Sequence, residues 1–486
     1  MATPTLMGLP TEILDEIVQH ALPEGFESLA LTCKEFYTIC TPYIEHHNQL
    51  SFEFRYFVYR PHGYQGKRII PSIYLAFELI MRIAMEPRVA RYIVHADLRH
   101  DDWPHRPRLP PDVIPDVDDD GPLVALFAQS PYLAQAGLDW KEFYAQIRED
   151  HEPYPRYSQY AAAFLLTLLP NTKILKLPVN WEPEEKTSKL LEVIVRKAKQ
   201  PDFLWSEQSL AQVTEFEPYC RQGMGSPPVD LNEAVPFLAL PNVRSFCGRS
   251  CLGTGGTSML IVPKDPYLHY GEALETASFE RCCFDDVVIA EFLKHTPRLR
   301  VFQYSHTSKG DGDHQDWDIC KFVTTIEREV GHQLEELSIA IRELHGSIHP
   351  GKASMGGFQR LQKLKLPLEF VECNPQAGEF QDAAVNDISF RESEKEPLIC
   401  DLVPSSVSKL TFESSGRDRH GMTLKAIFHD LAAIKESKLP SLKQIHISCI
   451  GDLQPEEGYR RECERLAMEI EKVGVHYSFG HGSIVI

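Results

Sequence analysis

One pattern of apolar residues recurs along most of this 486-residue chain, and it limits the possible folds more than any other feature. In loose form the pattern is Leu-x-x-Leu-x-Leu. Its last two members share one face of a short strand, because successive strand side chains point to opposite faces. The first member lies three residues earlier, at the bend that enters the strand. The copies are Thr172, Leu175, Leu177; Val243, Phe246, Gly248; Leu299, Phe302, Tyr304; Leu334, Leu337, Ile339; Leu361, Leu364, Leu366; Val407, Leu410, Phe412; Leu442, Ile445, Ile447; and Gly474, Tyr477, Phe479.

The intervals between these copies are uneven. The two longest run from Leu175 to Phe246 and from Phe246 to Phe302, and we expect each to contain a further copy. Alternation of strands with helices predicts βα units on a parallel sheet with right-handed crossovers. The helical patterns lie at residues 157–169, 182–199, 285–294, 317–330, 423–438 and 456–473.

The repeats resemble divergent leucine-rich repeats, although most are longer than the usual unit of about 20 to 29 residues. The resemblance implies an α/β fold in which a curved solenoid has its parallel strands on the concave side. The rival is a closed or doubly wound α/β enzyme domain. It is disfavoured because no Gly-rich phosphate loop follows a predicted strand. A proline two residues before the first anchor recurs and favours the solenoid, at Pro170, Pro241, Pro297 and Pro440.

The first 40 residues form a separate helical segment. Ile13, Leu14 and Ile17 share one helical face after Pro10, which suits a first helical turn. Residues 23–25 break this helix, a second apolar stripe follows, and Pro42 is expected to end the segment soon after. So short a segment makes only a small core, so it is expected to pack on a partner or to cap the domain that follows.

The residue order in this segment resembles the F-box. The matching residues are Leu9, Pro10, Glu12, Ile13, Leu14, Ile17, Leu29, Cys33, Lys34 and Phe36. Thr32 and Phe26 depart from the family pattern but keep roughly the usual volume. The resemblance implies docking on the small adaptor of a cullin-type SCF ubiquitin ligase, and through it on the cullin. The implied adaptor-binding residues are Leu9, Pro10, Ile13, Leu14, Ile17, Leu29, Cys33 and Phe36.

Three segments follow from these patterns. Residues 1–48 are the F-box-like helical segment, residues 49–150 a helical linker region, and residues 151–486 the irregular repeat array. The linker region contains a Pro- and Asp-rich stretch at residues 101–122, which is expected to be a disordered insertion. Residues 306–318 and 373–397 are predicted to be further polar loops.

The overall charge and hydropathy restrict the partners. With 69 acidic and 50 basic residues the formal charge is −19, which disfavours nucleic acid. The N-terminus does not resemble a signal peptide, and the longest apolar run, residues 161–169, is too short to span a membrane. We therefore expect a cytoplasmic or nuclear protein, whose 12 cysteines are reduced.

The sequence predicts no catalytic residue, no metal site and no cofactor. Cys247 and Cys251 have a zinc-like spacing without a second pair, and the aspartates around 311–318 depart from the calcium-loop pattern. His345 and His349 lack the glutamate of a zinc protease, and residues 253–256 lack the lysine of a phosphate loop. The Gly-x-Ser-x-Gly elbow of serine hydrolases is also missing.

These features together favour a non-catalytic substrate-recognition subunit of an SCF-type ligase, which holds a target protein on its repeats. The alternatives are a protein-interaction scaffold outside any ligase and an α/β hydrolase. Polar residues between the apolar anchors would face the concave surface or the adjoining rim and contact the target. They are Lys176, Gln303, Ser338, Lys365, Thr411 and His446.

Overall fold

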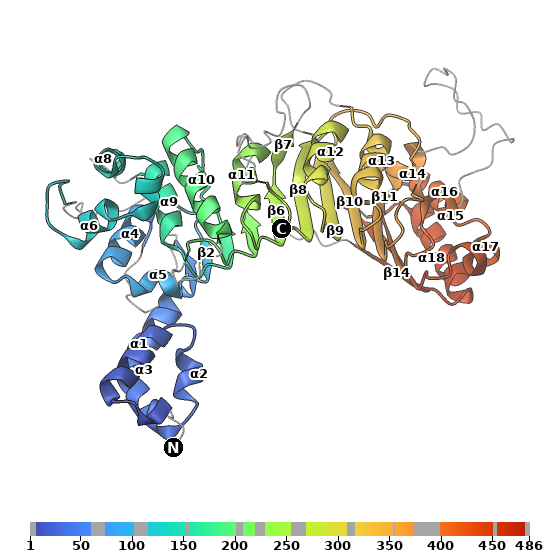
Figure 1. Cartoon of the computed structure of the whole chain (residues 1–486). Helices are drawn as coiled ribbons and strands as arrows, with labels where there is room; N and C mark the ends of the chain where they lie inside the picture. Colours follow the sequence, from blue (N-terminus) through green and yellow to red (C-terminus); the bar gives the residue numbers. More distant parts are fainter. Residues whose placement is uncertain are drawn as a thin grey trace. The chain divides into compact units, whose positions relative to one another are not determined.

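The computed structural model of the chain divides into two compact units (Figure 1). Unit 1 comprises Met1–Tyr219 with Leu240–Asn242, and unit 2 comprises Cys220–Ala239 with Val243–Ile486. Both units combine helices with parallel strands, which confirms the predicted α/β class. The structure describes residues 6–59, 73–101, 115–151, 156–200, 208–218, 229–253, 269–308, 316–353, 355–373, 399–450 and 454–481.

Unit 1 begins with three helices that we call the N-terminal hairpin. They are α1 (Thr11–Ala21), α2 (Phe26–Ala30) and α3 (Lys34–Phe54), after a single 3-10 turn, η1 (Leu6–Gly8).

Helix α3 is longer than the sequence predicted. The prediction that Pro42 ends the segment is wrong, because this residue lies inside α3. An interior proline costs a helix roughly 3 kcal/mol, and the burial of Cys40, Leu50 and Phe54 on the same helix offsets that cost. The boundary predicted at residue 48 therefore falls within a continuous helix. Only Arg55 separates α3 from the first strand, β1 (Tyr56–Val58).

A parallel sheet runs through unit 1 in the order β1-β2-β3-β4. Its further strands are β2 (His95–Asp97), β3 (Ile174–Lys176) and β4 (Glu215–Glu217). The sheet therefore starts within residues 49–150, which the sequence assigned to a helical linker. Strands of three residues carry too little periodicity to be distinguished from loops in the sequence.

Helices pack beside these strands, and their facing sides are apolar. They are α4 (Ala76–Met85), α5 (Arg88–Tyr92), α6 (Pro122–Ala128), α7 (Pro131–Gln135), α8 (Trp140–His151), α9 (Gln159–Leu165) with the 3-10 turn η2 (Leu166–Leu168), and α10 (Glu185–Lys199). Helices α9 and α10 confirm two predicted helical patterns. Most of the predicted insertion at residues 101–122 lies outside the described residues, and its last residue, Pro122, opens α6.

The main sheet of unit 2 is also parallel, in the order β6-β8-β9-β10-β11-β12-β13-β14. A two-residue strand, β5 (Val229–Asp230), and β7 (Cys251–Gly253) pair beside it. The bounds are β6 (Ser245–Arg249), β8 (Thr276–Phe284), β9 (Val301–Thr307), β10 (Glu336–Glu343), β11 (Lys363–Pro367), β12 (Lys409–Ser414), β13 (Gln444–Cys449) and β14 (His476–His481).

The register of this sheet confirms the repeat pattern. The middle anchors Phe302, Leu337 and Leu364 are direct neighbours, and Leu410, Ile445 and Tyr477 continue the same row. Each of the two long intervals contains one further copy, as predicted. Phe216 on β4 pairs with Leu175, and Ala277 on β8 lies between Phe246 and Phe302 in the row.

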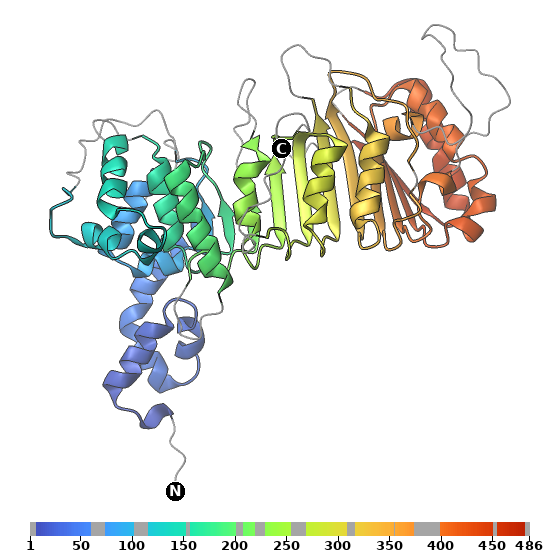
Figure 2. The same cartoon turned by 45° about the horizontal axis from the view of Figure 1, so that its top comes forward.

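Helices cover one face of the unit 2 sheet, as α12 and α13 show beside β8, β9 and β10 in Figures 1 and 2. The anchor side chains Phe302, Leu337 and Ile339 are buried and form the core of this unit. We call the other side of the sheet the open face. The helices are α11 (Leu231–Leu238), α12 (Asp286–Lys294), α13 (Ile319–Val330), α14 (Leu368–Cys373), α15 (Ile399–Leu402), α16 (Asp418–Ile427), α17 (Leu431–Lys438) and α18 (Glu457–Lys472).

Two sequence predictions in unit 2 need correction. The helix predicted at residues 423–438 is split into α16 and α17, because Asp430 adopts a left-handed conformation with φ of 57°. The polar loop predicted at residues 306–318 has buried ends, since His306 belongs to β9 and Trp317 is buried beside it. The polar stretch at residues 373–397 lies almost wholly outside the described residues.

Candidate functional site

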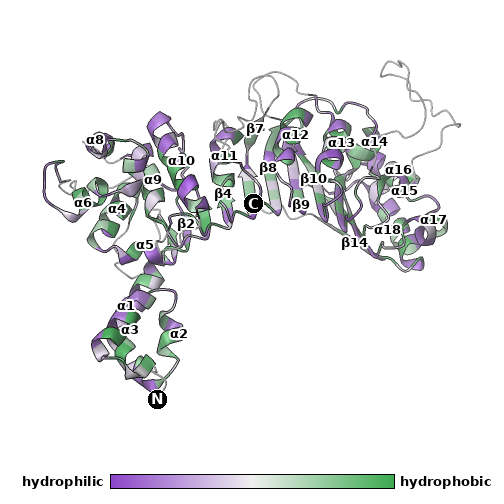
Figure 3. Cartoon of the chain, viewed as in Figure 1, coloured by the Kyte–Doolittle hydropathy of each residue, from purple (hydrophilic) through white to green (hydrophobic). Residues whose placement is uncertain are grey.

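The N-terminal hairpin has a core of its own. Leu14 and Val18 from α1 meet Phe26 from α2 and Phe36 and Cys40 from α3. Tyr43 ties α3 to α1, because its hydroxyl lies 2.8 and 2.9 Å from the two carboxylate oxygens of Asp15. Figure 3 shows hydrophobic residues along α1 and α3. Of the residues predicted to contact an adaptor, Leu14 and Phe36 are therefore occupied by the internal packing of the hairpin.

Other apolar side chains of the hairpin stay exposed. Leu9 is 40% exposed just before α1, and Ile13 is 41% exposed in the first turn of that helix. Pro10 is exposed beside them. Leu31 and Tyr37, which were not among the predicted contacts, are 82% and 52% exposed. They lie beside the second apolar stripe, and that position was the available signal.

The remaining predicted contacts have an intermediate position. Ile17, Leu29 and Cys33 are half-buried and pack against the edge of the hairpin core. The structure thus separates the eight predicted residues into an exposed group, an edge group and a buried group. A partner could reach the exposed group directly and the edge group at its rim.

Polar contacts attach the hairpin to the rest of unit 1. Arg88 of α5 donates to the side-chain oxygen of Gln19 at 3.0 Å. His47 Nδ1 lies 2.9 Å from the hydroxyl of Tyr92. Burial lowers the pKa of His47, so its ring is neutral near pH 7. The hairpin is therefore a supported part of unit 1.

The second candidate site is the open face of unit 2. Gln303, Ser338, Lys365, Thr411 and His446 are successive partners across β9 to β13, so they form one continuous row, which we call the open-face row. All five are half-buried, in the alternation expected for a sheet with one covered face. Lys176, the sixth predicted target contact, lies on β3 in unit 1.

Several members of the open-face row already have partners. Gln303 donates to Glu336 at 3.0 Å, and His446 Nδ1 lies 2.8 Å from the hydroxyl of Ser478. Lys365 forms an ion pair with Glu413, a buried carboxylate on the same face that sequence reasoning missed. A target that binds these side chains would replace their existing contacts with new ones. This exchange favours selectivity among targets more than high affinity for any one of them.

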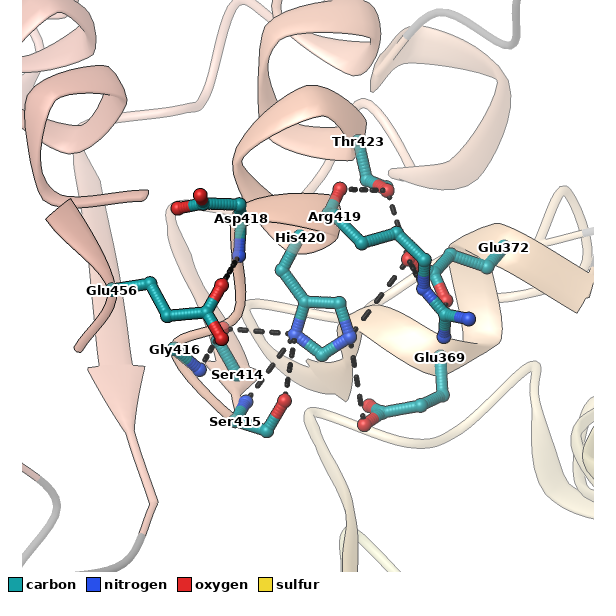
Figure 4. A network of polar contacts seen from close by, with 10 residues as sticks. All are labelled: Glu369, Glu372, Ser414, Ser415, Gly416, Asp418, Arg419, His420, Thr423 and Glu456. Carbon is teal, nitrogen blue, oxygen red and sulfur yellow. Dashed lines mark hydrogen bonds and ion pairs between the residues drawn. The ribbon is translucent and has the colours of Figure 1, made fainter. Parts of the chain in front are cut away.

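A polar network at the end of β12 resembles a hydrolytic arrangement (Figure 4). Ser414 Oγ lies 3.0 Å from Nδ1 of His420, and Nε2 of that ring lies 3.8 Å from carboxylate oxygens of Glu369 and Glu372. The backbone N–H of Ser415 also donates to Nδ1, at 3.3 Å. Nδ1 is therefore an acceptor, and the ring proton sits on Nε2, toward the carboxylates.

Burial makes this network better suited to holding elements together than to catalysis. Ser414 and His420 are each 1% exposed, so a substrate carbonyl has no route to the hydroxyl. The backbone N–H of Gly416 also donates to Ser414 Oγ, at 2.9 Å. Burial raises the pKa of Glu369 beside it. The network joins α14, β12 and α16, and this explains why polar residues lie in an otherwise apolar layer.

The cysteines and possible metal ligands add no chemistry that the geometry supports. The cysteines in the described ranges are free thiols, and Cys251 is buried. Within those ranges no three His, Cys, Asp or Glu side chains gather as a metal ion requires. Asp311 and Asp313 and most of the Gly-rich stretch at 253–256 lie outside them. In the same part of the chain no helix is long and apolar enough to cross a membrane.

Comparison with known proteins adds no assignment. The sequence matches no protein-family model, and a search of curated proteins finds no match either.

Proposed function

We propose that this chain is the substrate-recognition subunit of an SCF-type, cullin-RING ubiquitin ligase. In this proposal the N-terminal hairpin is an F-box that docks on the adaptor, and unit 2 belongs to a leucine-rich-type solenoid that holds a target protein. The subunit contributes no catalytic group. It brings target lysines close to a ubiquitin-charged enzyme and so raises their effective concentration.

One observation carries the proposal. The hairpin completes its own small core and still leaves Leu9, Ile13 and Leu31 in solvent. Full burial of one such side chain is worth about 1.5 to 3 kcal/mol, so a partner that covers this surface gains several contacts at once. The resemblance of Leu9 and Ile13 to F-box positions supports the ligase adaptor as that partner. The uncovered sheet face of unit 2 supports the second half of the proposal, because it offers a row of polar side chains to a target.

Co-purification with the SCF adaptor tests the proposal. Replacing both Leu9 and Ile13 by Ala should weaken adaptor binding, because truncating an interface anchor costs about 2 kcal/mol or more. These side chains lie outside the hairpin core, so the variant should keep its thermal stability. Met468→Ala is the matched control, since Met468 is 62% exposed on α18 and belongs to no proposed interface.

The outcomes distinguish the proposal from a scaffold without ligase function. Loss of adaptor binding in the double variant, with binding intact in the wild type and in the control, supports the ligase subunit. A wild-type chain that fails to bind the adaptor would refute it. Unchanged binding by the double variant would remove these two residues from the interface.

A further inference from the structure

A cavity of about 310 Å³ lies at the carboxyl ends of β8 and β9 in unit 2. Its walls include Asp285 and Asp286 at the start of α12, and Trp317 and Asp318 at the start of α13. His306, near the end of β9, lines it as well. The carboxyl edge of a parallel sheet is where α/β folds commonly bind ligands. The open-face row lies on the sheet surface, so this cavity is a separate site.

His306 supplies a buried polar atom with no partner in the described ranges. The residue is 2% exposed, and its Nε2 makes no hydrogen bond there. The hydroxyl of Tyr304 lies 3.0 Å from Nδ1 on the other side of the ring. Because Nδ1 points toward Tyr304, Nε2 lies on the other side of the ring from that hydroxyl, and the His306 ring lines the cavity.

The contacts of Tyr304 fix the tautomer of His306. Its hydroxyl accepts from the backbone N–H of Phe284 at 2.9 Å and lies 3.1 Å from the carbonyl oxygen of Cys282. A carbonyl cannot donate, so the hydroxyl proton must point at Cys282. Nδ1 of His306 then carries a proton and donates to the hydroxyl, which is the one assignment that makes all three contacts hydrogen bonds. Nε2 is left as a bare acceptor.

The cavity is also strongly acidic. Asp285, Asp286, Asp316 and Asp318 contribute four carboxylates to its lining. The N-termini of α12 and α13 contribute only about half a positive charge each. The Lys321 ammonium, 3.6 Å from the Asp318 carboxylate, offsets one more charge. The balance stays negative when Asp285 is left out of the count, so the cavity attracts a cation.

Backbone hydrogen bonds hold three of these carboxylates in place. Asp285 accepts from Val288 N–H at 2.9 Å, and Asp318 accepts from Lys321 N–H at 2.8 Å. Asp316 accepts from the backbone N–H of Ser347 at 2.7 Å. The acceptors are therefore positioned before a ligand arrives, which lowers the entropy cost of binding. Asp286 has no hydrogen bond or ion pair within the described ranges.

We propose that this cavity binds the guanidinium group of an arginine side chain presented by the target protein, an inference that rests on the proposed function. A guanidinium carries five N–H donors and no acceptor, which matches a wall of carboxylates with one bare imidazole nitrogen. It is also planar and packs on aromatic rings. Trp317 and His306 provide such a wall, stacked with centroids 4.1 Å apart and planes 6° apart.

Isothermal titration calorimetry on the full chain tests the site. The probes are N-acetyl-arginine amide, N-acetyl-lysine amide and the neutral isostere N-acetyl-citrulline amide. We expect saturable binding of the arginine probe, weaker binding of the lysine probe and no binding of the citrulline probe. Guanidinium chloride is the fourth probe, because equal affinity for the bare ion would overturn the assignment to a side chain.

Two variants locate the binding. Asp286→Asn removes a charge without breaking a described contact and should weaken the arginine probe about tenfold or more. His306→Phe keeps the ring against Trp317 and removes the Nε2 acceptor, with a similar loss expected. Glu436→Gln, on the exposed side of α17, is the matched control for charge. Unchanged affinity in Asp286→Asn would overturn the site, and this variant decides if His306→Phe does not fold.

Adaptor binding separates this inference from the proposed function. Asp286→Asn should co-purify with the adaptor as well as the wild type does. If Asp286→Asn loses arginine binding and still binds the adaptor, the arginine site is assigned to the cavity, and the ligase role is not affected by the result. If the wild-type chain binds the arginine probe at this cavity but does not bind the adaptor, the ligase role is refuted. The cavity then remains a binding site for a cationic ligand only.

Discussion

The imidazole of His306 links the stability of unit 2 to pH. Burial lowers its pKa to about 4, below the usual value of about 6.5 in an unfolded chain. Between these two values the unfolded chain binds a proton that the folded unit does not. The free energy of unfolding should therefore fall as the pH drops from about 6.5 to about 4, by at most about 1.4 kcal/mol per pH unit.

Urea unfolding at several pH values measures this effect, with His306→Phe as the comparison. Tyr304 on β9 contacts the ring, and Asp285 at α12, Asp316 and Asp318 before α13, and His349 in the loop after β10 line the same cavity. Burial is the cause of the lowered pKa of His306. The variant should lose less stability than the wild type over this range. Equal slopes would contradict a neutral, buried imidazole.

At the scale of single elements, we expect Ala substitutions to lower the free energy of unfolding strongly in the anchor row and only slightly in the open-face row. Leu337 is fully buried on β10, and the next residue, Ser338, is half-buried on the other face. Leu337→Ala should lower the free energy of unfolding of unit 2 by about 2 to 5 kcal/mol, because it leaves a cavity in a packed row. Ser338→Ala should change it by only about 0.5 kcal/mol.

Chemical denaturation of the two single variants measures the difference. Similar losses in both would mean that the two faces of β10 do not differ in burial, contrary to the register of the sheet. A loss confined to Leu337→Ala would assign stability to the anchor row and leave the open-face row free for binding.

The strands that the sequence predicted well are those whose anchors are large. Leu337, Leu364 and Leu410 stand out against polar neighbours and lie in one row of the sheet, as their spacing implied. Strand β8 was missed because its middle anchor is Ala277, whose side chain carries a weak hydrophobic signal. Strands β1 and β2 were missed because three residues cannot establish a period.

The candidate sites were predictable only in part, because proximity between distant residues leaves no local pattern. The open-face row was found from the alternation within each strand. The acidic cavity was read as a polar loop, since nothing near Asp316 in the sequence indicates that Trp317 packs on the buried ring of His306. In the hairpin the apolar stripe was visible, but its division between the buried Leu14 and the exposed Ile13 depends on how α1 packs on α3.

At the scale of the whole molecule, the excess of acid sets the solution behaviour. The formal charge of −19 falls to zero near pH 5.5. Net charge keeps protein molecules apart, so the full chain should be least soluble near that pH and more soluble at pH 7.5. Static light scattering at low salt across this range measures the association. A constant signal from pH 5 to 8 would contradict this expectation.

Helix α3 passes into β1 through the single residue Arg55. A junction this short is stiff, because one residue can change the angle between α3 and β1 very little without breaking either element. A partner bound to the N-terminal hairpin is therefore held in a fixed orientation relative to β1. If that partner is the ligase adaptor, a flexible spacer inserted after Phe54 would leave adaptor binding intact but would loosen the orientation of the hairpin relative to β1. Ubiquitin would then be transferred to a wider set of target lysines.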